Sequence, residues 1–232
     1  MNPQPPDLLA EKFPDLHKAL YSLPKNVLKR SGRFLYSAFS TLTHGKYYLI
    51  GINPGGDLTK PPYSSQTLLS DIQKLGAKTD NAYLDENDWS TPRYQEGVKA
   101  LCKYLDYETR DLCASNLIFI RGKVKEKTIP VLAQSFGYKT LYEATKKIFW
   151  PVHDQVMKIV KPECIFAIGT EDAYETMREL MGLPQTVGKR NYSGPLYYAT
   201  SGEYNGRLVN LIGLPHFSHN SPDLELISKC ME

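Results

Sequence analysis

The chain has 232 residues, 41% of them hydrophobic, so it is long enough to bury a sizeable core. Its net charge of +3 suits a polyanionic partner but is much smaller than that of a dedicated nucleic-acid-binding protein. The sequence has no long apolar run and no basic-then-apolar start, which argues against a membrane span and a secretory signal. We therefore expect a cytoplasmic protein.

Apolar runs alternate with helix-like segments along the chain, a pattern typical of a parallel sheet with crossover helices. After a loose start over residues 1–7, helices are expected over residues 7–23, 65–75, 94–105, 141–160 and 171–181. Strands are expected over residues 47–52, 116–120, 163–168 and 208–214. With no internal boundary, the chain is predicted to form one domain over residues 1–232. The predicted fold is an α/β/α sandwich of three layers around a short, mainly four-stranded parallel sheet.

The four cysteines lie far apart, without the paired spacing of a zinc or iron-sulfur site. They are Cys102, Cys113, Cys164 and Cys230. We expect buried thiols, no metal and no other cofactor.

Polar residues follow the predicted strands. The first strand stops at the turn Asn53-Pro54-Gly55-Gly56, Asn116 lies beside an apolar run, and His216 follows the last strand. Each has an ordinary structural interpretation: a tight turn, a cap and a hydrogen-bonded histidine. Ligands of open parallel sheets bind outside the carboxyl ends of the strands, however, so the three residues are expected around one cleft.

Three segments together resemble the uracil-DNA glycosylase superfamily. Gly51-Ile52-Asn53-Pro54-Gly55 is similar to the first motif of its mismatch-specific and single-strand-selective branches, Asn116 matches the base-reading asparagine, and His216-Phe217-Ser218 resembles the closing motif. The resemblance implies that Asn53 orients the attacking water and that His216 donates to the pyrimidine O2. It implies base contacts from Gly51, Ile52, Pro54, Gly55, Asn116 and Ser218.

Several residues are candidates for contacting DNA or for inserting into it as a wedge. A basic run, Arg121, Lys123, Lys125 and Lys127, is either solvated surface or a phosphate contact, and Ser221 falls where the closing motif often has a further serine. We expect Lys123, Lys125 and Ser221 to contact DNA. Phe217 and His219 replace prolines of the family pattern, and Asn220 stands where a wedge leucine is usual, so Leu224 or Phe217 are alternatives for the wedge.

Gly55 stands where strict uracil enzymes carry a bulky aromatic residue that excludes groups on C5 of the base. The resemblance thus implies a monomeric, monofunctional, cofactor-free DNA glycosylase that hydrolyses the N-glycosidic bond of a flipped-out base in single- or double-stranded DNA. The base is uracil or a modified one, including bulky 5-substituted cytosine, and the role is base-excision repair or defence against modified foreign DNA.

Two alternatives remain open. One is a non-catalytic DNA- or protein-binding module on the same fold, because a fold does not guarantee a function. The other is a metal-dependent hydrolase in which His216, His219 and Asp223 converge on one ion.

Overall fold

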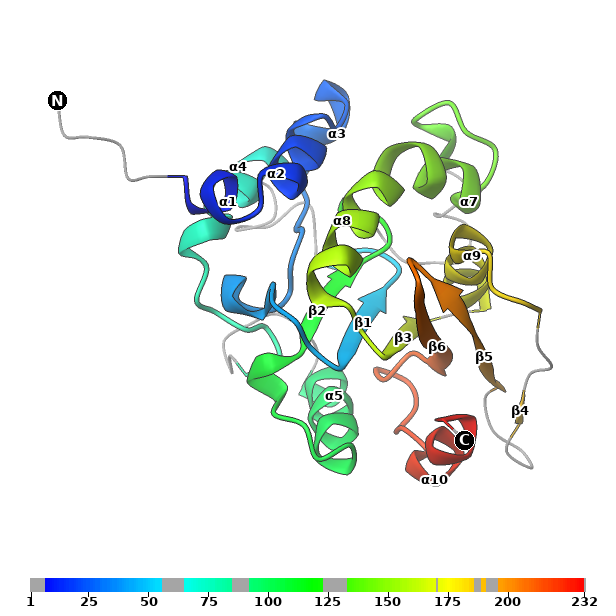
Figure 1. Cartoon of the computed structure of the whole chain (residues 1–232). Coiled ribbons are helices and arrows are strands. Elements are labelled where there is room, and N and C mark those ends of the chain that lie inside the picture. The colour runs from blue at the N-terminus through cyan, green and yellow to red at the C-terminus, as the bar shows by residue number, and fades with distance from the viewer. Residues whose placement is uncertain are drawn as a thin grey trace, which may run out of the picture.

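A computed structural model describes residues 7–55, 65–84, 92–122, 133–169, 171–185, 189–190 and 196–231. Its central sheet has the strand order β2-β1-β3-β6-β5-β4 (Figure 1). The parallel strands are β2 (Cys113–Asn116), β1 (Tyr47–Gly51), β3 (Cys164–Gly169) and β6 (Arg207–Pro215). The predicted α/β fold with four parallel strands is confirmed.

Two antiparallel strands extend this sheet beyond the prediction. β5 (Leu196–Tyr204) pairs with β6 from Tyr198 opposite Gly213 to Tyr204 opposite Arg207, and the two-residue β4 (Lys189–Arg190) pairs with β5. The β5-β6 hairpin turns at Asn205 and Gly206, which both have positive φ, at 51° and 72°. Asn-Gly is the strongest short-range hairpin signal in a sequence, so β5 was predictable in principle.

The second strand begins and ends three to four residues earlier than predicted, at Cys113 and Asn116 in place of residues 116–120. The prediction followed the apolar run over residues 117–120, which is buried but irregular. Leu117 and Ile118 still donate backbone hydrogen bonds to Gly51 and Ile52, at 2.8 and 2.9 Å. Polar Asn116 therefore lies at the carboxyl end of β2 and not at its start.

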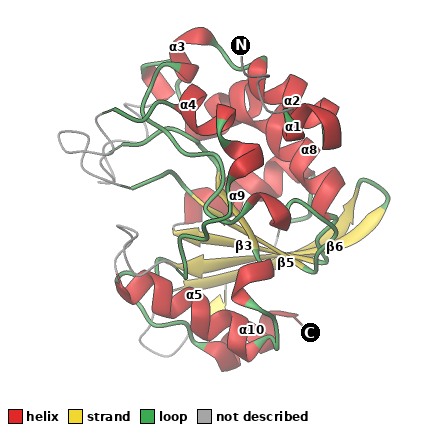
Figure 2. Ribbon diagram, turned by 90° about the vertical axis from the view of Figure 1, so that its left-hand side faces the viewer, coloured by secondary structure: helices red, strands yellow, loops and turns green. Residues whose placement is uncertain are grey.

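Helices cover both faces of the sheet, as Figure 2 shows from the side. One face is covered by α1 (Leu8–Lys12), α2 (Pro14–Tyr21), α3 (Lys25–Leu28), α4 (Leu68–Gln73), α7 (Leu141–Ala144), α8 (Trp150–Val160) and α9 (Glu171–Met181). The other is covered by α5 (Pro92–Tyr104) and α10 (Leu224–Met231). Both clusters of buried side chains draw on alternate residues of the strands, such as Tyr48 and Ile50 for the first and Leu49 for the second. The predicted three layers are present.

Prolines and π-helical geometry divide two of the predicted helices. Pro14 cannot continue α1, so the segment over residues 7–23 becomes two helices with Pro14 starting the second. A π-helical turn, η4 (Thr145–Phe149), separates α7 from α8. The helices over residues 94–105 and 171–181 are confirmed within two residues, whereas α3 and α10 were not predicted.

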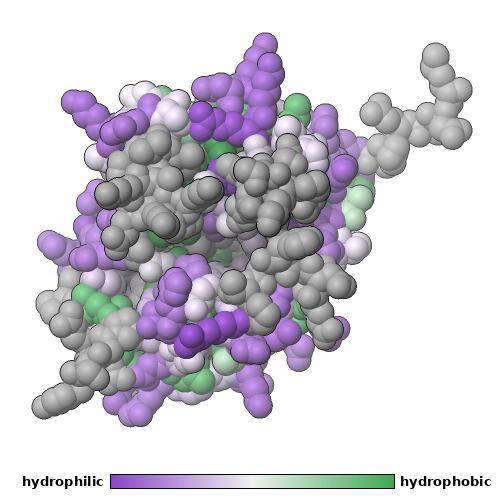
Figure 3. All heavy atoms as spheres, turned by 180° about the vertical axis from the view of Figure 1, so that it is seen from behind, coloured by the Kyte–Doolittle hydropathy of each residue, from purple (hydrophilic) through white to green (hydrophobic). Residues whose placement is uncertain are grey.

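Cys102, Cys113 and Cys164 are buried free thiols, as expected, and Cys230 is half-buried. Within the described residues, no helix combines the length and the apolar character needed to cross a lipid bilayer. Among the described residues visible from behind in Figure 3, most are hydrophilic, and the hydrophobic ones form small separate groups.

Candidate active site at the carboxyl edge of the sheet

The four parallel strands end together at one edge, formed by Asn116, Gly51, Gly169 and Pro215, which we call the carboxyl edge. Register places Gly51 beside Asn116 and Gly169 beside Pro215, which precedes His216. The Ile52 side chain lies against Gly169 and so links the two pairs. Because β3 alone separates β1 from β6, the ends of these two strands are about 10 Å apart. Asn53 follows β1, Asn116 ends β2 and His216 follows β6, so the three residues lie along this edge, with β3 between β1 and β6.

Asn116 and Gly51 are in such close contact that only glycine fits. A Cβ atom on Gly51 would overlap with the Asn116 Oδ1. Asn116 is 7% exposed, and its buried Nδ2 has no hydrogen-bond partner among the described residues. A buried donor without a partner costs about 1–3 kcal/mol, so this amide nitrogen is a group that a bound water or a ligand could satisfy.

The side-chain amide nitrogen of Asn53, unlike that of Asn116, is hydrogen-bonded to the backbone. Nδ2 donates to the carbonyl oxygens of Pro54 and Gly122, at 3.3 and 3.2 Å. These two bonds fix which end of the amide is the nitrogen, so Oδ1 is the atom available as an acceptor. Half-buried Asn53 therefore presents an oriented carbonyl oxygen.

Arg121 secures the same turn. Its side chain is only 5% exposed, and Nη1 donates to the carbonyl oxygen of Gly55. Arg121 therefore points inward, which corrects its interpretation as part of a surface basic run. Lys123, Lys125 and Lys127 lie outside the described residues.

His216 is held as one tautomer. The backbone N–H of Ser218 donates to its Nδ1 at 3.2 Å, so in the neutral ring the proton is on Nε2. Burial lowers the pKa of His216, and nearby His219 lowers it further. The ring is consequently neutral near pH 7 and offers an Nε2–H donor.

Tyr94 of α5 packs against the His216 ring and against the neighbouring Phe217. The Tyr94 ring centroid is 5.0 Å from that of His216 and 5.9 Å from that of Phe217. Phe217 is fully buried against Gly97, where a Cβ would come within 2.7 Å of the phenylalanine side chain. Phe217 therefore cannot serve as a wedge in DNA. Leu224 is half-buried and packs against the same cluster.

A buried pair lies beneath Asn116. The Tyr48 hydroxyl donates to Nδ1 of His153 at 3.1 Å, and Nε2 of His153 donates to the Leu117 carbonyl at 3.2 Å. Complete burial lowers the pKa of His153 to about 4, so this ring is neutral. It supports the chain directly after Asn116.

The remaining predicted residues differ in exposure. Ile52 and Pro54 are buried, so the Ile52 side chain belongs to the core and a ligand would meet its backbone. Gly55 is exposed, and among the described residues nothing lies within 4 Å of where its Cβ would be. Ser218 fixes the His216 tautomer through its backbone. Exposed Ser221 lines an open pocket together with Arg93 and His219.

The metal-site alternative finds no ligand set. Nowhere in the described part of the chain do three or more histidine, cysteine, aspartate or glutamate side chains gather as they would around an ion. Asp223 instead caps α10, accepting a hydrogen bond from the Leu226 N–H at 3.0 Å.

Comparison with known protein families matches none of them to this chain, and comparison with curated proteins gives no significant match. The resemblance to the glycosylases therefore rests on the three motifs and on their positions in the fold.

Sequence reasoning missed the supporting roles of Arg121, Tyr94 and His153. Tyr94 was predicted within a helix, and its place three residues before Gly97 is the one available signal, because a helical turn brings the two to one face. No local pattern marks Arg121 or His153, since their partners lie 66 and 36 or more residues away in the chain.

Proposed function

We propose that this protein is a monofunctional DNA glycosylase, similar to the uracil-DNA glycosylase superfamily, that excises a flipped-out pyrimidine-type base. The observation that carries this proposal is the set of three polar groups along the carboxyl edge, of which the Asn116 donor is buried without a partner among the described residues. They are the Nδ2 donor of Asn116, the fixed Oδ1 acceptor of Asn53 and the Nε2–H donor of neutral His216.

These groups suit the hydrolysis of an N-glycosidic bond. The sugar gains positive charge and the departing base gains negative charge as the bond breaks, so the reaction needs a water on one side and donors on the other. The Asn53 Oδ1 orients that water, and His216 donates to the base oxygen on which charge develops. Asn116 reads the edge of the base. An amide oxygen cannot take up the proton of the water as a carboxylate does, so we expect slow chemistry.

The lack of a side chain at Gly55 favours bases larger than uracil as substrates. No described side chain fills the space beside it, so a substituent on C5 of the base fits there. Tyr63, which would close this wall if it turned inward, lies outside the described residues. The substrate class is uracil or a 5-substituted pyrimidine, and a bulky modified cytosine of foreign DNA would make the role defence.

The proposal also names DNA as partner, through the motif Ser221 and the basic residues Lys123 and Lys125. Of these, exposed Ser221 is a described residue at the pocket beside the His216 turn. Substituting Ser221 by glutamate should weaken DNA binding without altering the rate on bound DNA, because the added negative charge repels phosphate.

The test is an excision assay on labelled single- and double-stranded oligonucleotides. They carry uracil, mismatched thymine, hypoxanthine, or hydroxymethylated or glycosylated cytosine, and alkaline cleavage reveals abasic sites. We expect cleavage at one or more pyrimidines, lost in both Asn53→Ala and His216→Ala. Binding of such DNA with every base intact would favour the non-catalytic module, and neither binding nor cleavage would remove the nucleic-acid proposal.

A further inference from the structure

Residues 121 and 122 hold the Asn53 turn from two sides. The Gly55 carbonyl accepts from Nη1 of Arg121, and Asn53 Nδ2 donates to the Gly122 carbonyl at 3.2 Å. We infer that Arg121 is a positioning residue that fixes the direction of the Asn53 carbonyl oxygen. This inference rests on the proposed function and extends it to a residue outside the recognised motifs.

The segment that carries Arg121 is itself fixed to the fold. The Arg121 backbone N–H donates to the Ser31 carbonyl oxygen at 2.9 Å, and Ile120 forms an isolated antiparallel β-bridge with Gly32. Arg33 N–H donates to Phe119 at 2.8 Å. Arg121 can fix the position of the turn only if its own backbone is rigid. These three backbone interactions hold that backbone in place.

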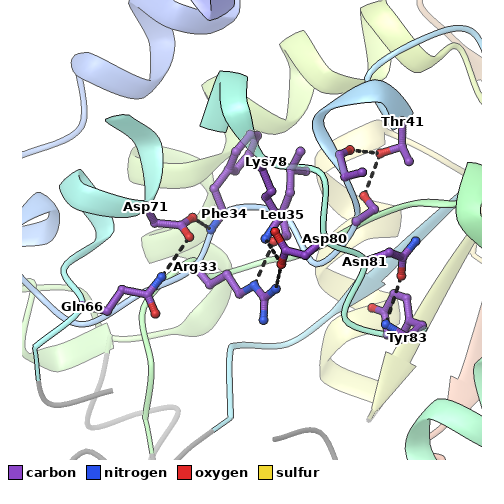
Figure 4. A network of polar contacts seen from close by, with 12 residues as sticks. Arg33, Phe34, Leu35, Thr41, Gln66, Asp71, Lys78, Asp80, Asn81 and Tyr83 are labelled. Carbon is purple, nitrogen blue, oxygen red and sulfur yellow. Dashed lines mark hydrogen bonds and ion pairs between the residues drawn. The ribbon is translucent and has the colours of Figure 1, made fainter. Parts of the chain in front are cut away.

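A buried acidic side chain, Asp71, lies near Arg121. Burial raises the pKa of Asp71, and the Phe34 N–H, Lys78, Arg33 and, least of all, Arg121 lower it. Its position is fixed, because Oδ2 accepts from Phe34 N–H at 2.8 Å and Oδ1 from Gln66 Nε2 at 3.2 Å (Figure 4). A buried guanidinium is costly unless it is hydrogen-bonded, and Arg121 is bonded to the Gly55 carbonyl.

The chemistry explains why arginine serves this position. A guanidinium is planar, remains charged, and keeps its donors in fixed directions, whereas a lysine ammonium is a flexible point charge. Arg121 is 5% exposed and bound to the turn, so its loss should affect the direction of Asn53 and not the contact with the DNA backbone. Misplacement of a reacting group by about 1 Å can cost roughly a hundredfold in rate.

The first measurement compares Arg121→Ala and Arg121→Lys with wild type on the best substrate from the excision assay. We expect Arg121→Ala to lower the single-turnover rate roughly a hundredfold with the Kd for DNA unchanged, and Arg121→Lys to recover part of the loss. Millimolar guanidinium should restore part of the Arg121→Ala rate. The matched control is Arg178→Ala, since Arg178 also donates to a backbone carbonyl, that of Leu183, from a mostly buried side chain in α9.

The second measurement needs no activity. The side-chain amide of Asn53, assigned by its disappearance in Asn53→Ala, should give a sharp NMR signal in wild type and in Arg178→Ala, but a shifted or broadened one in Arg121→Ala. If wild type excises no base while this signal changes as expected, the proposed function fails and the positioning role stands. An unchanged signal, an unchanged rate, or equal losses of rate and DNA affinity in Arg121→Ala would overturn the inference.

Discussion

Asn53 and Asn116 differ in how the fold satisfies their amide groups. Both Nδ2 hydrogens of Asn53 face backbone carbonyls, whereas Nδ2 of Asn116 has no partner in the described part of the chain. The first amide is positioned by the protein, and the second keeps a donor without a partner, which the proposed function assigns to the base. Sequence motifs predicted both residues but not this division, because the Gly122 carbonyl comes from a segment 69 residues away.

Asn53→Asp tests the fixed orientation of the first amide. Aspartate at this position would supply a stronger base, but its carboxylate cannot donate to the carbonyls of Pro54 and Gly122 and would face both oxygens. We predict a loss of about 1–3 kcal/mol in the free energy of unfolding at pH 7, measured by urea denaturation. Part of this loss should disappear when the carboxyl is protonated at low pH. If Asn53→Asp has the same free energy of unfolding as the wild type at pH 7, these hydrogen bonds do not contribute to stability.

The pH dependence of excision should report His216. Burial and His219 lower its pKa, so the ring is neutral above about pH 6.5 and gains a proton only as the pH falls through its lowered value. Protonation puts a hydrogen on Nδ1, which removes the acceptor for the Ser218 N–H. We predict a constant single-turnover rate from neutral to mildly alkaline pH and a loss on the acid side.

Substituting His219 by alanine provides the control for this assignment. His219 is the smaller of the two causes that lower the His216 pKa, so its removal should move the acid limb modestly to higher pH. A shift to lower pH, or no acid limb in wild type, would contradict the assignment to His216.

Helix α5 is the element that connects the core to the candidate site. Gly97 allows Phe217 to pack on this helix, and Tyr94 lies one turn earlier against the His216 ring. The turn over residues 216–220 is therefore held from beneath by α5 and internally by backbone bonds from His219 and Asn220 to the His216 carbonyl.

Gly97→Ala tests this connection. The added methyl group would overlap with Phe217, so we expect a loss of about 1–3 kcal/mol in stability together with reduced excision, because the displaced Phe217 carries His216 with it. Gly182→Ala is the control: Gly182 has φ +68° and no neighbour of its Cβ within 4 Å among the described residues, so alanine there strains the backbone away from the site. Equal effects of the two variants on excision at matched stability would exclude a specific role for the α5 packing.

Element prediction succeeded where hydrophobic pattern decides the structure. β1 and β3 are buried between parallel neighbours and have continuous apolar runs, and β6 has a mainly apolar run that is buried over its carboxyl-terminal half. β5 was missed because its exposure is mixed, as befits a strand near the sheet edge. The β2 bounds were wrong because the buried apolar run over residues 117–120 continues past the end of the strand, where pairing is reduced to single backbone bonds and one isolated bridge.

At the scale of the whole molecule, a fully buried histidine should limit acid stability. The pKa of His153 is about 4 in the folded state and near 6.5 when unfolded, so between these values the unfolded chain binds the proton and the folded chain does not. The contribution of neutral His153 to the free energy of unfolding, about 3 kcal/mol, is therefore fully present above about pH 6.5 and is lost as the pH falls toward 4. His216 adds to the loss and Asp71, whose pKa is raised, opposes part of it.

His153→Gln should flatten this part of the curve of unfolding free energy against pH. Tyr48→Phe is the control, because it removes the hydroxyl that bonds to His153 and leaves the titrating ring in place. Equal slopes in wild type and His153→Gln would refute the contribution of His153.

We propose that the carboxyl edge of this sheet hydrolyses an N-glycosidic bond. The most direct measurement is mass spectrometry of the base and the abasic strand released from DNA in ¹⁸O-labelled water, for wild type, Asn53→Ala and His216→Ala. We predict an intact free base, one ¹⁸O atom on the sugar of the abasic product, and loss of both products in each variant. Release of a nucleotide in place of a base, or products that persist in both variants, would contradict the account.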